Sequence, residues 1–293
     1  MKQGAEPAPG VLYLVGTPIG HLADLSERAR SVLAKADVIA CEDTRHSGQL
    51  LSSLGAVGKR LSFHQHNTRG RIPQLLALLA QHQSVAVISD AGLPGISDPG
   101  EELVAAAREA ERQVICIPGP CAATTALVSS GLPSGRFCFE GFLPTKAKER
   151  RERLKAIAAD PRTTVLYEAP HRLLKLIEEL SDHCGGERPL QVARELTKRH
   201  EEQVGPTIAA ALTHFSSHKP QGEFTLVLGG SQEPAAIEHD DQHWLEELNK
   251  LIHQGLSANA AAKQLAQSSG RAKRELYALL HTEGSKTDGQ GSD

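Results

Sequence analysis

Short apolar runs alternate with amphipathic segments along most of the chain. Four early runs are apolar enough to be buried strands, and they span residues 11–15, 38–41, 85–89 and 114–117. Helical patterns lie between these runs, for example at residues 26–33 and 101–110. Strands that alternate with helices in this way form a largely parallel sheet covered by helices. The hydrophobic pattern therefore predicts an α/β fold.

A second series of alternating elements begins after Pro118-Gly-Pro120. Its patterns predict a helix at 122–130, a strand at 137–139, a helix from Ala147, a strand at 163–167, a helix from Arg172, and strands at 190–194 and 223–228. We therefore expect two α/β domains of similar size, at residues 10–119 and 120–230.

The segments outside these two domains are predicted to be simpler. Residues 1–9 have the character of a flexible leader, and residues 231–241 that of a polar linker. Three amphipathic patterns, at 244–253, 258–267 and 273–281, predict a small helical domain of helix-turn-helix appearance over residues 242–283. Residues 284–293 are rich in Gly, Ser and Asp and are predicted to be a disordered tail.

Composition and charge exclude several classes of protein. Charged residues make up 23% of the chain and hydrophobic residues 40%, as in ordinary globular proteins, and no apolar run reaches the length of a membrane span. The five cysteines show no C-x-x-C spacing, so no zinc or redox motif is indicated, and we expect a reducing, cytoplasmic location. A net charge of −3 allows only a local basic surface, and the 3% of aromatic residues disfavours binding of nucleic acid by base stacking.

The loop after the third early strand is the most informative part of the sequence. Ser89-Asp-Ala-Gly-Leu-Pro-Gly-Ile-Ser-Asp-Pro-Gly100 holds three glycines and two prolines, together with the carboxylates of Asp90 and Asp98. Asp98-Pro99 has the pattern of a helix N-cap followed by proline in the first turn. In open α/β sheets, ligands bind at the mouth between such strands and helices. The loop therefore predicts an enzyme or a small-molecule binder.

Other loops at the same predicted edge of the sheet carry similar groups. They are Gly16-Thr-Pro-Ile-Gly20, Glu42-Asp-Thr-Arg45 and Pro118-Gly-Pro-Cys-Ala122. Each loop also has a purely structural explanation. In the same order, these are a tight turn, a capped helix start and an interdomain hinge. The first loop fits neither the P-loop nor the G-x-G-x-x-G pattern, so a nucleotide site of those two kinds is not indicated.

Two polar stretches and one basic stretch lie in the second domain. Tyr167-Glu-Ala-Pro-His-Arg172 and Arg194-Glu-Leu-Thr-Lys-Arg-His-Glu-Glu202 could be solvated loops or walls of a site. Residues 145–155 hold six cationic and two acidic side chains, a local charge of +4. Such a helix is either a solvated surface or a contact for the phosphates of a nucleic acid.

Taken together, these motifs resemble one family. Its motifs include Leu14-Val-Gly-Thr-Pro-Ile-Gly20, Gly131-Leu-Pro133, Gly141-Phe-Leu-Pro144 and Gly222-Glu-Phe224, in addition to the loops quoted above. The chain resembles the bacterial small-subunit ribosomal RNA (cytidine 2′-O) methyltransferases of the tetrapyrrole methylase superfamily, from about Val11 to Gly230. Two positions depart from the family pattern, because His21 stands where Asn is usual and Cys121 where Ser is usual.

The resemblance implies a two-domain class III methyltransferase with a small C-terminal helical domain. It implies S-adenosylmethionine as cofactor in a cleft between the α/β domains, a homodimer, and 2′-O-methylation of a cytidine in the decoding region of 16S rRNA. By motif position, the expected cofactor-binding residues are Pro18, Asp90, Ala91, Gly92, Cys121, Ala122, Tyr167, Glu223, Phe224 and Thr225.

The reaction also suggests candidates for catalysis and RNA binding. A ribose hydroxyl is a poor nucleophile until it begins to lose its proton, so a general base is plausible, although positioning could contribute more. No metal is required. The candidate bases are Glu42, Asp43, Glu168 and Glu195. The candidate RNA-binding residues are Arg45, Lys146, Arg150, Arg151, Arg153, Lys198 and Arg199.

Two other functions remain open from the sequence. One is C-methylation of a tetrapyrrole by an enzyme of the same fold, which needs a broad apolar trough for the macrocycle. The other is a non-enzymatic RNA-binding protein in which the helical tail makes the contacts. The basic stretch and the tail favour RNA over a macrocycle.

Overall fold

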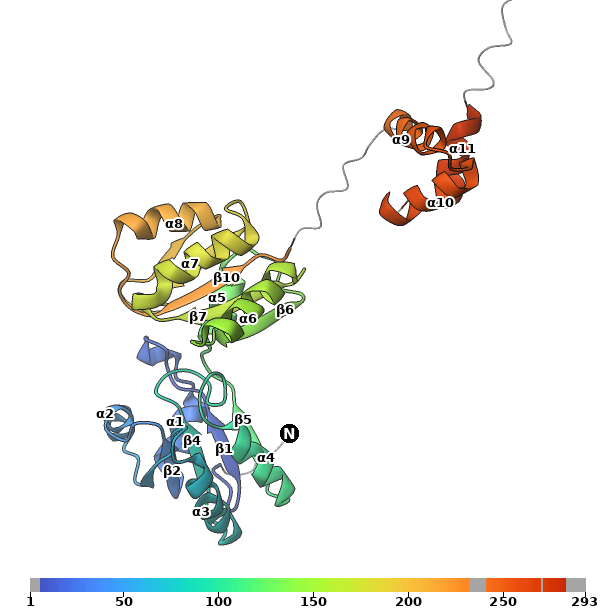
Figure 1. Cartoon of the computed structure of the whole chain (residues 1–293). Coiled ribbons are helices and arrows are strands. Elements are labelled where there is room, and N and C mark those ends of the chain that lie inside the picture. Colours follow the sequence, from blue (N-terminus) through green and yellow to red (C-terminus); the bar gives the residue numbers. More distant parts are fainter. Residues whose placement is uncertain (1–5, 232–240, 270, 283–293) are drawn as a thin grey trace, which may run out of the picture. The chain divides into compact units, whose positions relative to one another are not determined.

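The computed structural model describes residues 6–231, 241–269 and 271–282, which belong to two compact units. The first unit spans residues 1–231 and the second residues 232–293. The first unit contains two five-stranded sheets, and the second contains helices (Figure 1). No helix in the described ranges is long and apolar enough to cross a membrane.

The first sheet is entirely parallel, as the alternating pattern predicted. Its strand order is β3-β2-β4-β1-β5. The strands are β1 (Leu12–Val15), β2 (Val38–Cys41), β3 (Lys59–Ser62), β4 (Val85–Ile88) and β5 (Val114–Ile117). Between them lie the 3₁₀ turn η1 (Leu22–Asp24) and the helices α1 (Glu27–Lys35), α2 (His46–Ser53), α3 (Thr68–Ala80) and α4 (Glu101–Glu109). Because the strands are parallel, the loops that follow them meet at one edge of the sheet.

Helices cover both faces of this sheet, which explains why its strands are continuous apolar runs. Successive residues of a strand point to opposite faces. Tyr13 packs in the cluster that holds α1 and α2, whereas its neighbour Leu12 packs in the cluster that holds α3 and α4. Both side chains are fully buried.

The second sheet is mixed, which the alternation of elements did not indicate. Its order is β6-β7-β10-β8-β9, and β6–β7 is its one parallel pair. The strands are β6 (Phe137–Phe142), β7 (Thr163–Glu168), β8 (Leu190–Arg194), β9 (Glu202–Val204) and β10 (Phe224–Leu228). A short loop joins β8 to β9, and a connection of that length permits only antiparallel pairing.

The helices of this half are divided between the two faces of the sheet. They are α5 (Ala122–Ser129), α6 (Ala147–Ala159), α7 (Pro170–Cys184) and α8 (Ile208–Ser217). The larger core packs α6, α7 and α8 against alternate strand residues such as Leu226, whereas Val227 packs with α5. The four helices are labelled in Figure 1. Ile19, from the loop after β1, packs in the core beside α5 and so joins the two halves of the unit.

The second unit consists of α9 (Asp241–His253), α10 (Ala258–Ser269) and α11 (Lys273–Thr282) in the described ranges. These bounds agree with the three predicted helices to within three residues at each end. The helices share a small core of buried Leu and Ala side chains: Leu248, Ala261, Ala262, Leu265 and Leu276. The predicted tail, most of the predicted linker and the first five residues of the predicted leader lie outside the described residues.

Two predicted helix starts had different outcomes. Ser26 is the N-cap of α1, and its hydroxyl accepts a hydrogen bond from the N–H of Ala29 at 3.1 Å. The prediction that Asp98 caps α4 is wrong, because Gly100 holds the N-cap position. The carboxylate of Asp98 is therefore not used to cap the helix.

Two glycines bring the loops after β1 and β5 into direct contact. A Cβ on Gly16 would lie 2.7 Å from the Cα of Gly119, and a Cβ on Gly119 would lie 2.8 Å from the Cα of Gly16. The obstacle in each case is backbone, so neither position has room for a side chain.

We predict that Gly119→Ala lowers the free energy of unfolding by about 1–3 kcal/mol, because the added methyl must push two loops apart. The matched control is Gly70→Ala in α3, where nothing lies within 4 Å of the new methyl. There the helix propensity of alanine should stabilise the protein by up to about 1 kcal/mol. Urea unfolding of the three proteins checks both signs. Equal midpoints for Gly119→Ala and the wild type would contradict the contact.

Candidate active site

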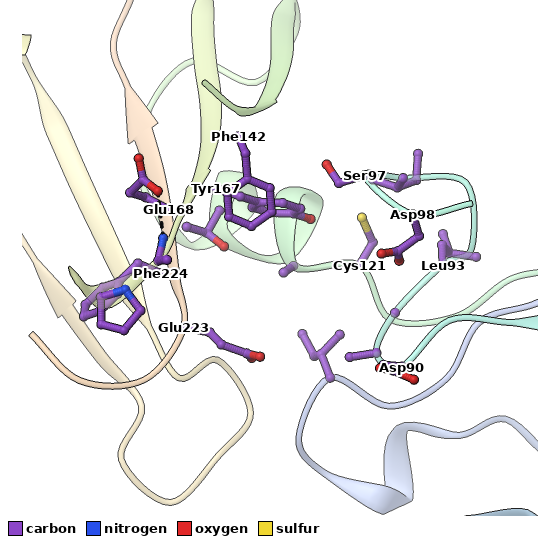
Figure 2. A pocket seen from close by; sticks show the side chains of 18 residues that line it. Asp90, Leu93, Ser97, Asp98, Cys121, Phe142, Tyr167, Glu168, Glu223 and Phe224 are labelled. Atoms are coloured by element: carbon purple, nitrogen blue, oxygen red, sulfur yellow. Dashed lines mark hydrogen bonds between the residues drawn. The ribbon is translucent and has the colours of Figure 1, made fainter. Parts of the chain in front are cut away.

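A cleft of about 350 Å³ lies where the loops after β1, β4 and β5 meet β7 and β10 of the second sheet (Figure 2). Nine of the residues expected to bind cofactor line it: Asp90, Ala91, Gly92, Cys121, Ala122, Tyr167, Glu223, Phe224 and Thr225. The tenth, Pro18, lines an adjoining cavity of about 430 Å³ that shares Asp90, Ala91 and Glu223 with the cleft. The structure thus brings the predicted cofactor residues together.

Several lining residues were not expected from the sequence. They are Ile19, Leu93, Ile96, Ser97, Asp98, Phe142, Ala169 and Pro170, together with Glu168, which was considered only as a base. The sequence pattern marks Asp98 as one flank of the glycine loop and predicts it as a helix cap, not as a lining residue. The apolar residues gave no chemical signal, because only the folded loops place them on one cavity.

Tyr167 forms an aromatic wall of the cleft. Its hydroxyl accepts a hydrogen bond from the N–H of Ala123 at 3.0 Å, near the start of α5. Its ring makes edge contacts with Phe139 and Phe142, at centroid distances of 5.0 and 5.7 Å. Burial raises the pKa of Tyr167, so the hydroxyl stays protonated.

Backbone contacts tie the loops of the first sheet together below the cleft. Thr17 and Gly92 exchange hydrogen bonds, with N–H to O distances of 2.9 and 3.1 Å. The carboxylate of Asp90 accepts a hydrogen bond from the N–H of Asp43 at 3.2 Å. Asp90 therefore fixes the loop after β2 while it also lines the cleft.

Three carboxylates, Glu42, Asp90 and Asp98, are close enough to influence one another. Burial raises the pKa of Asp98 to about 6, and Glu42 and Asp90 add to this effect, whereas a hydrogen bond with Ser89 opposes it. Burial and the charge of Asp90 also raise the pKa of Glu42. In Figure 2 the carboxylates of Asp98 and Glu223 approach the cleft from opposite walls.

The other three candidate bases are held by internal contacts. The carboxylate of Asp43 accepts a hydrogen bond from the N–H of Arg45 at 2.8 Å, and this contact lowers the pKa of Asp43. Glu168 is buried and accepts hydrogen bonds from the side chain of Arg172 at 2.7 Å and from the N–H of Ala169 at 2.9 Å. Figure 2 shows its carboxylate turned away from Asp98.

Glu195 holds Glu223, the residue just before β10, by a hydrogen bond. It accepts hydrogen bonds from the N–H of Glu223 at 2.9 Å and from the ammonium of Lys198 at 3.1 Å. Burial acts to raise the pKa of Glu195, but these two donors outweigh it and hold the pKa below its ordinary value. No cluster of three or more possible metal ligands is found among the residues that the structure describes.

Residues 11–212 match the family of Tetrapyrrole (Corrin/Porphyrin) Methylases. The chain belongs to this family. The match includes all strands of the first sheet. In the second sheet it includes β6, β7, β8 and β9, and it ends within α8, before β10. The cleft described above is thus a feature of a tetrapyrrole methylase.

Two curated relatives of this tetrapyrrole methylase carry the same name. A "Ribosomal RNA small subunit methyltransferase I" from Synechocystis sp. is 47% identical over 92% of this chain and 97% of its own length. A protein of the same name from Escherichia coli O157:H7 is 43% identical over 94% of this chain and 96% of its own length.

Solved structures share the fold. The uroporphyrin-III-C-methyltransferase from Thermus thermophilus matches with a TM-score of 0.55 and 25% identity, over 75% of this chain and 94% of that one. A structure of the uroporphyrin-III C-methyltransferase from the same organism, complexed with S-adenosyl homocysteine, matches with a TM-score of 0.51 and 20% identity, over 74% of this chain and 96% of that one.

The expectation that Arg150 binds RNA is corrected by the structure of this tetrapyrrole methylase. Arg150 is buried, and its guanidinium lies 2.7 Å from the carboxylate of Glu179 and 3.8 Å from that of Glu168. The residue occupies the inner face of α6, beside Leu154 and Ile157. A count of charges along the sequence cannot show which cations a helix turns inward.

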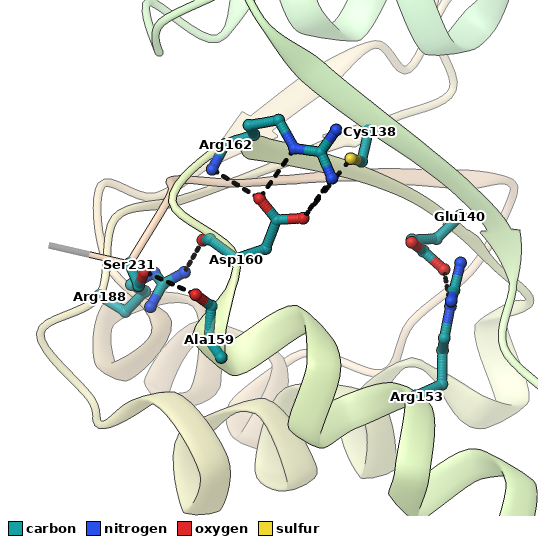
Figure 3. A network of polar contacts seen from close by, with 8 residues as sticks. All are labelled: Cys138, Glu140, Arg153, Ala159, Asp160, Arg162, Arg188 and Ser231. Carbon is teal, nitrogen blue, oxygen red and sulfur yellow. Dashed lines mark hydrogen bonds and ion pairs between the residues drawn. The ribbon is translucent and has the colours of Figure 1, made fainter.

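The other cations considered for RNA binding differ in how freely they face solvent. Arg45, Lys146, Arg151, Arg153 and Arg199 are exposed. Three of the five form ion pairs, Arg45 with Asp43, Lys146 with Glu149 and Arg153 with Glu140. Figure 3 shows the pair of Arg153 with Glu140.

Lys198 is different, because its ammonium bridges Glu195 and Glu223 at 3.1 and 2.8 Å. Burial acts to lower its pKa, but the two carboxylates outweigh burial and raise it above the ordinary value. Lys198 lines the cavity beside Pro18.

We predict that Arg150→Gln lowers the free energy of unfolding by about 3 kcal/mol, because it leaves the buried Glu168 and the half-buried Glu179 without one cation. The matched change Arg151→Gln, on the exposed side of the same helix, should stay within about 0.5 kcal/mol of the wild type. Chemical denaturation distinguishes the two positions. Equal losses at both would show that Arg150 is not the inward-facing cation.

Proposed function

We propose that this chain is an S-adenosylmethionine-dependent methyltransferase that methylates the ribose 2′-oxygen of a cytidine in the decoding region of 16S rRNA. The observation that carries the proposal is the 47% identity, over nearly the whole length of both chains, to a protein named as a small-subunit ribosomal RNA methyltransferase. The choice of a cytidine 2′-oxygen rests on the motif resemblance.

The chemistry of the cleft suits S-adenosylmethionine, which carries an adenosine, a sulfonium and an amino-acid group. Apolar side chains such as Leu93 and Ile96 suit the purine. The carboxylates of Asp90, Asp98 and Glu223 suit the cationic and hydroxyl groups of such a ligand. The residues that we propose to hold it are Pro18, Asp90, Ala91, Gly92, Cys121, Ala122, Tyr167, Glu223, Phe224 and Thr225.

The protein contributes position and proton transfer to the reaction. When bound, S-adenosylmethionine supplies a methyl group on a sulfonium ion, so that the new oxygen–carbon bond forms as the carbon–sulfur bond breaks and its electron pair stays on sulfur. The protein must hold the acceptor hydroxyl in line with that bond and accept its proton.

Exposed cations of α6 provide the proposed contact for rRNA phosphates. Lys148, Arg151 and Lys155 lie on the solvent side of this helix, at spacings of three and four residues. The exposed Arg45 and Arg199 lie in the loops after β2 and β8 and could extend this contact. We also propose a cytoplasmic location, because the proposed substrate is part of the small ribosomal subunit.

We further propose that the active form is a homodimer, as the motif resemblance implies. Two exposed apolar side chains support a homodimer. Val128 in α5 is 74% exposed, and Phe137 in β6 is 40% exposed. Such apolar surface is a candidate interface for a second copy.

The proposed function is tested by binding and transfer assays on the full chain. We expect calorimetry to show S-adenosylmethionine binding, and tritiated methyl groups to appear on small ribosomal subunits or 16S rRNA but not on a porphyrinoid. Transfer to the porphyrinoid alone would indicate the C-methyltransferase of the same fold. Binding of RNA without binding of S-adenosylmethionine would indicate a non-enzymatic protein.

We predict that Asp90→Ala weakens S-adenosylmethionine binding by about 10- to 150-fold, which corresponds to about 1.5–3 kcal/mol for one charge-assisted hydrogen bond. The control is Asp182→Ala on the exposed side of α7, which should bind like the wild type. Calorimetry measures the affinity, and circular dichroism checks the fold. An unchanged affinity in folded Asp90→Ala would remove this residue from the cofactor site.

We predict that replacing Lys148, Arg151 and Lys155 together by Gln weakens rRNA binding and flattens its salt dependence, because fewer counterions are released. Each lost phosphate contact lowers the slope of log K against log salt by about 0.7–0.9. A matched triple replacement at exposed cations elsewhere should leave the slope unchanged: Arg108, Lys175 and Lys219. Equal slopes for all three proteins would make α6 an ordinary solvated helix.

A further inference from the structure

The cavity of about 430 Å³ beside the cleft is lined by α2, by the loop after β1 and by Lys198, and we call it the α2 cavity. Ile19, Asp90, Ala91 and Glu223 line both the cleft and the α2 cavity. A ligand in one space would therefore meet a ligand in the other along this shared edge. The volume of the α2 cavity is in the range of pockets that take small molecules.

The walls of the α2 cavity combine aliphatic surface with neutral hydrogen-bonding groups. Pro18, Leu22 and Leu50 provide the aliphatic surface, and Leu22 is 65% exposed. Ser47 and Gln49 provide a hydroxyl and an amide. A pyrimidine base has two flat faces and an edge of hydrogen-bond donors and acceptors, so it matches both kinds of wall.

The hydroxyl of Ser47 lacks a partner that such a ligand would supply. Ser47 is only 4% exposed, and its Oγ has no hydrogen-bond partner in the part of the chain that the structure describes. The thiol of Cys41 lies close to it, but a thiol is a weak hydrogen-bonding group. Buried polar atoms without a partner are rare in folded proteins and costly.

Cationic residues next to the α2 cavity can hold the phosphates of a nucleotide. Lys198 lines the cavity, its neighbour Arg199 is exposed, and the exposed Arg45 is the N-cap residue of α2. The loop that carries Lys198 rests on Gly20, where a Cβ would lie 2.7 Å from the Oγ1 of Thr197. Phosphate contacts position a nucleotide, and a pocket then identifies its base.

A third cavity, of about 540 Å³, suits a nucleotide less well. It lies at the starts of α3 and α4, and Asp98 lines both it and the cleft. Arg69 lines this cavity, but so do Glu101 and Glu102, whose carboxylates repel a phosphate. The described residues that line the α2 cavity and not the cleft include no carboxylate.

We propose that the α2 cavity is the binding pocket for the target cytidine, which enters it unstacked from the RNA. The inference rests on the proposed function and names the part of the structure that receives the substrate. The base lies against the aliphatic walls with its polar edge toward Ser47 and Gln49. The ribose stays at the shared edge beside Ile19, where its 2′-oxygen faces the cofactor in the cleft. Enzymes that must reach one nucleotide within a helix take it out of the stack.

The first test fills the pocket from an exposed position. Gln49 is exposed and lines the α2 cavity, so Gln49→Trp should block entry of the base without disturbing a buried side chain. On small ribosomal subunits that lack the modification, we expect the single-turnover rate at saturating subunits to fall by about 10²-fold. The affinity for S-adenosylmethionine and for the subunit should each change by less than about 3-fold, because phosphate contacts supply most of the RNA affinity.

The matched control is Ser52→Trp, which places the same side chain on an exposed position of α2 that does not line the cavity. It should methylate like the wild type. Glu102→Trp fills the third cavity instead and should also be active. Loss of transfer in Glu102→Trp with full transfer in Gln49→Trp would assign the nucleotide to the third cavity and overturn the proposal.

The second test removes the unpartnered hydroxyl. Ser47→Ala should lower the single-turnover rate by about 3- to 10-fold, the effect of one hydrogen bond, while its urea midpoint does not fall. Ser130→Ala should do the reverse. The Ser130 hydroxyl is buried and donates to the carbonyl oxygen of Leu127 at 2.8 Å, so its loss lowers stability and leaves the rate unchanged.

A third measurement needs no turnover. With S-adenosyl homocysteine present, saturation-transfer NMR should show cytidine 5′-monophosphate bound to the wild type and to Ser52→Trp but not to Gln49→Trp. Three results would overturn the proposal: an unchanged rate in Gln49→Trp, a parallel loss of rate and cofactor affinity, or no binding of the nucleotide to the wild type. If the wild type binds S-adenosylmethionine but transfers nothing to rRNA, the proposed function itself fails and the pocket assignment fails with it.

Discussion

The close contact of Gly16 with Gly119 is the constraint on which the site depends. It joins the loop after β1 to the loop after β5 without an intervening side chain. The chain that leaves β5 therefore starts α5 directly beside the loop after β1, and Ile19 of that loop packs against α5. The seam between the two halves is consequently fixed at the strand ends, and the cleft lies along it. Larger side chains at either glycine would separate the loops that carry the functional groups.

The parallel sheet explains why several carboxylates meet at this seam. Strands β2 and β4 are neighbours and run in the same direction, so Glu42 and Asp90, which follow them, lie at the same edge. The loop after β4 then brings Asp98 back to the same place. Like charges at short range oppose ionisation and destabilise the folded state. Clusters of carboxylates with raised pKa values are typical of clefts that bind ligands.

Hydrophobic periodicity predicted the first sheet well, because helices on both faces make its central strands continuously apolar. It missed β3, whose residues Lys59–Ser62 are mostly polar at the edge of the sheet. It gave no sign of the antiparallel pairs in the second half, since pairing direction depends on connections rather than on side-chain pattern. Residues of the glycine loop do line the cleft. The local rule that predicts Asp98 as a helix cap fails, because the tertiary structure places Gly100 at the cap.

The positions of charged side chains were harder to predict than those of hydrophobic ones, for one physical reason. A cationic or acidic residue can face solvent, fill an internal ion pair or line a site, and its sequence neighbours are the same in all three cases. Arg150 and Glu168 resemble surface residues in the sequence, yet each is buried against the other charge. Asp98 shows the opposite case, because it borders two cavities and no ion pair to its carboxylate is found within the described residues. A carboxylate without a cationic partner can accept hydrogen bonds from a ligand, whereas one in a buried ion pair stabilises the fold.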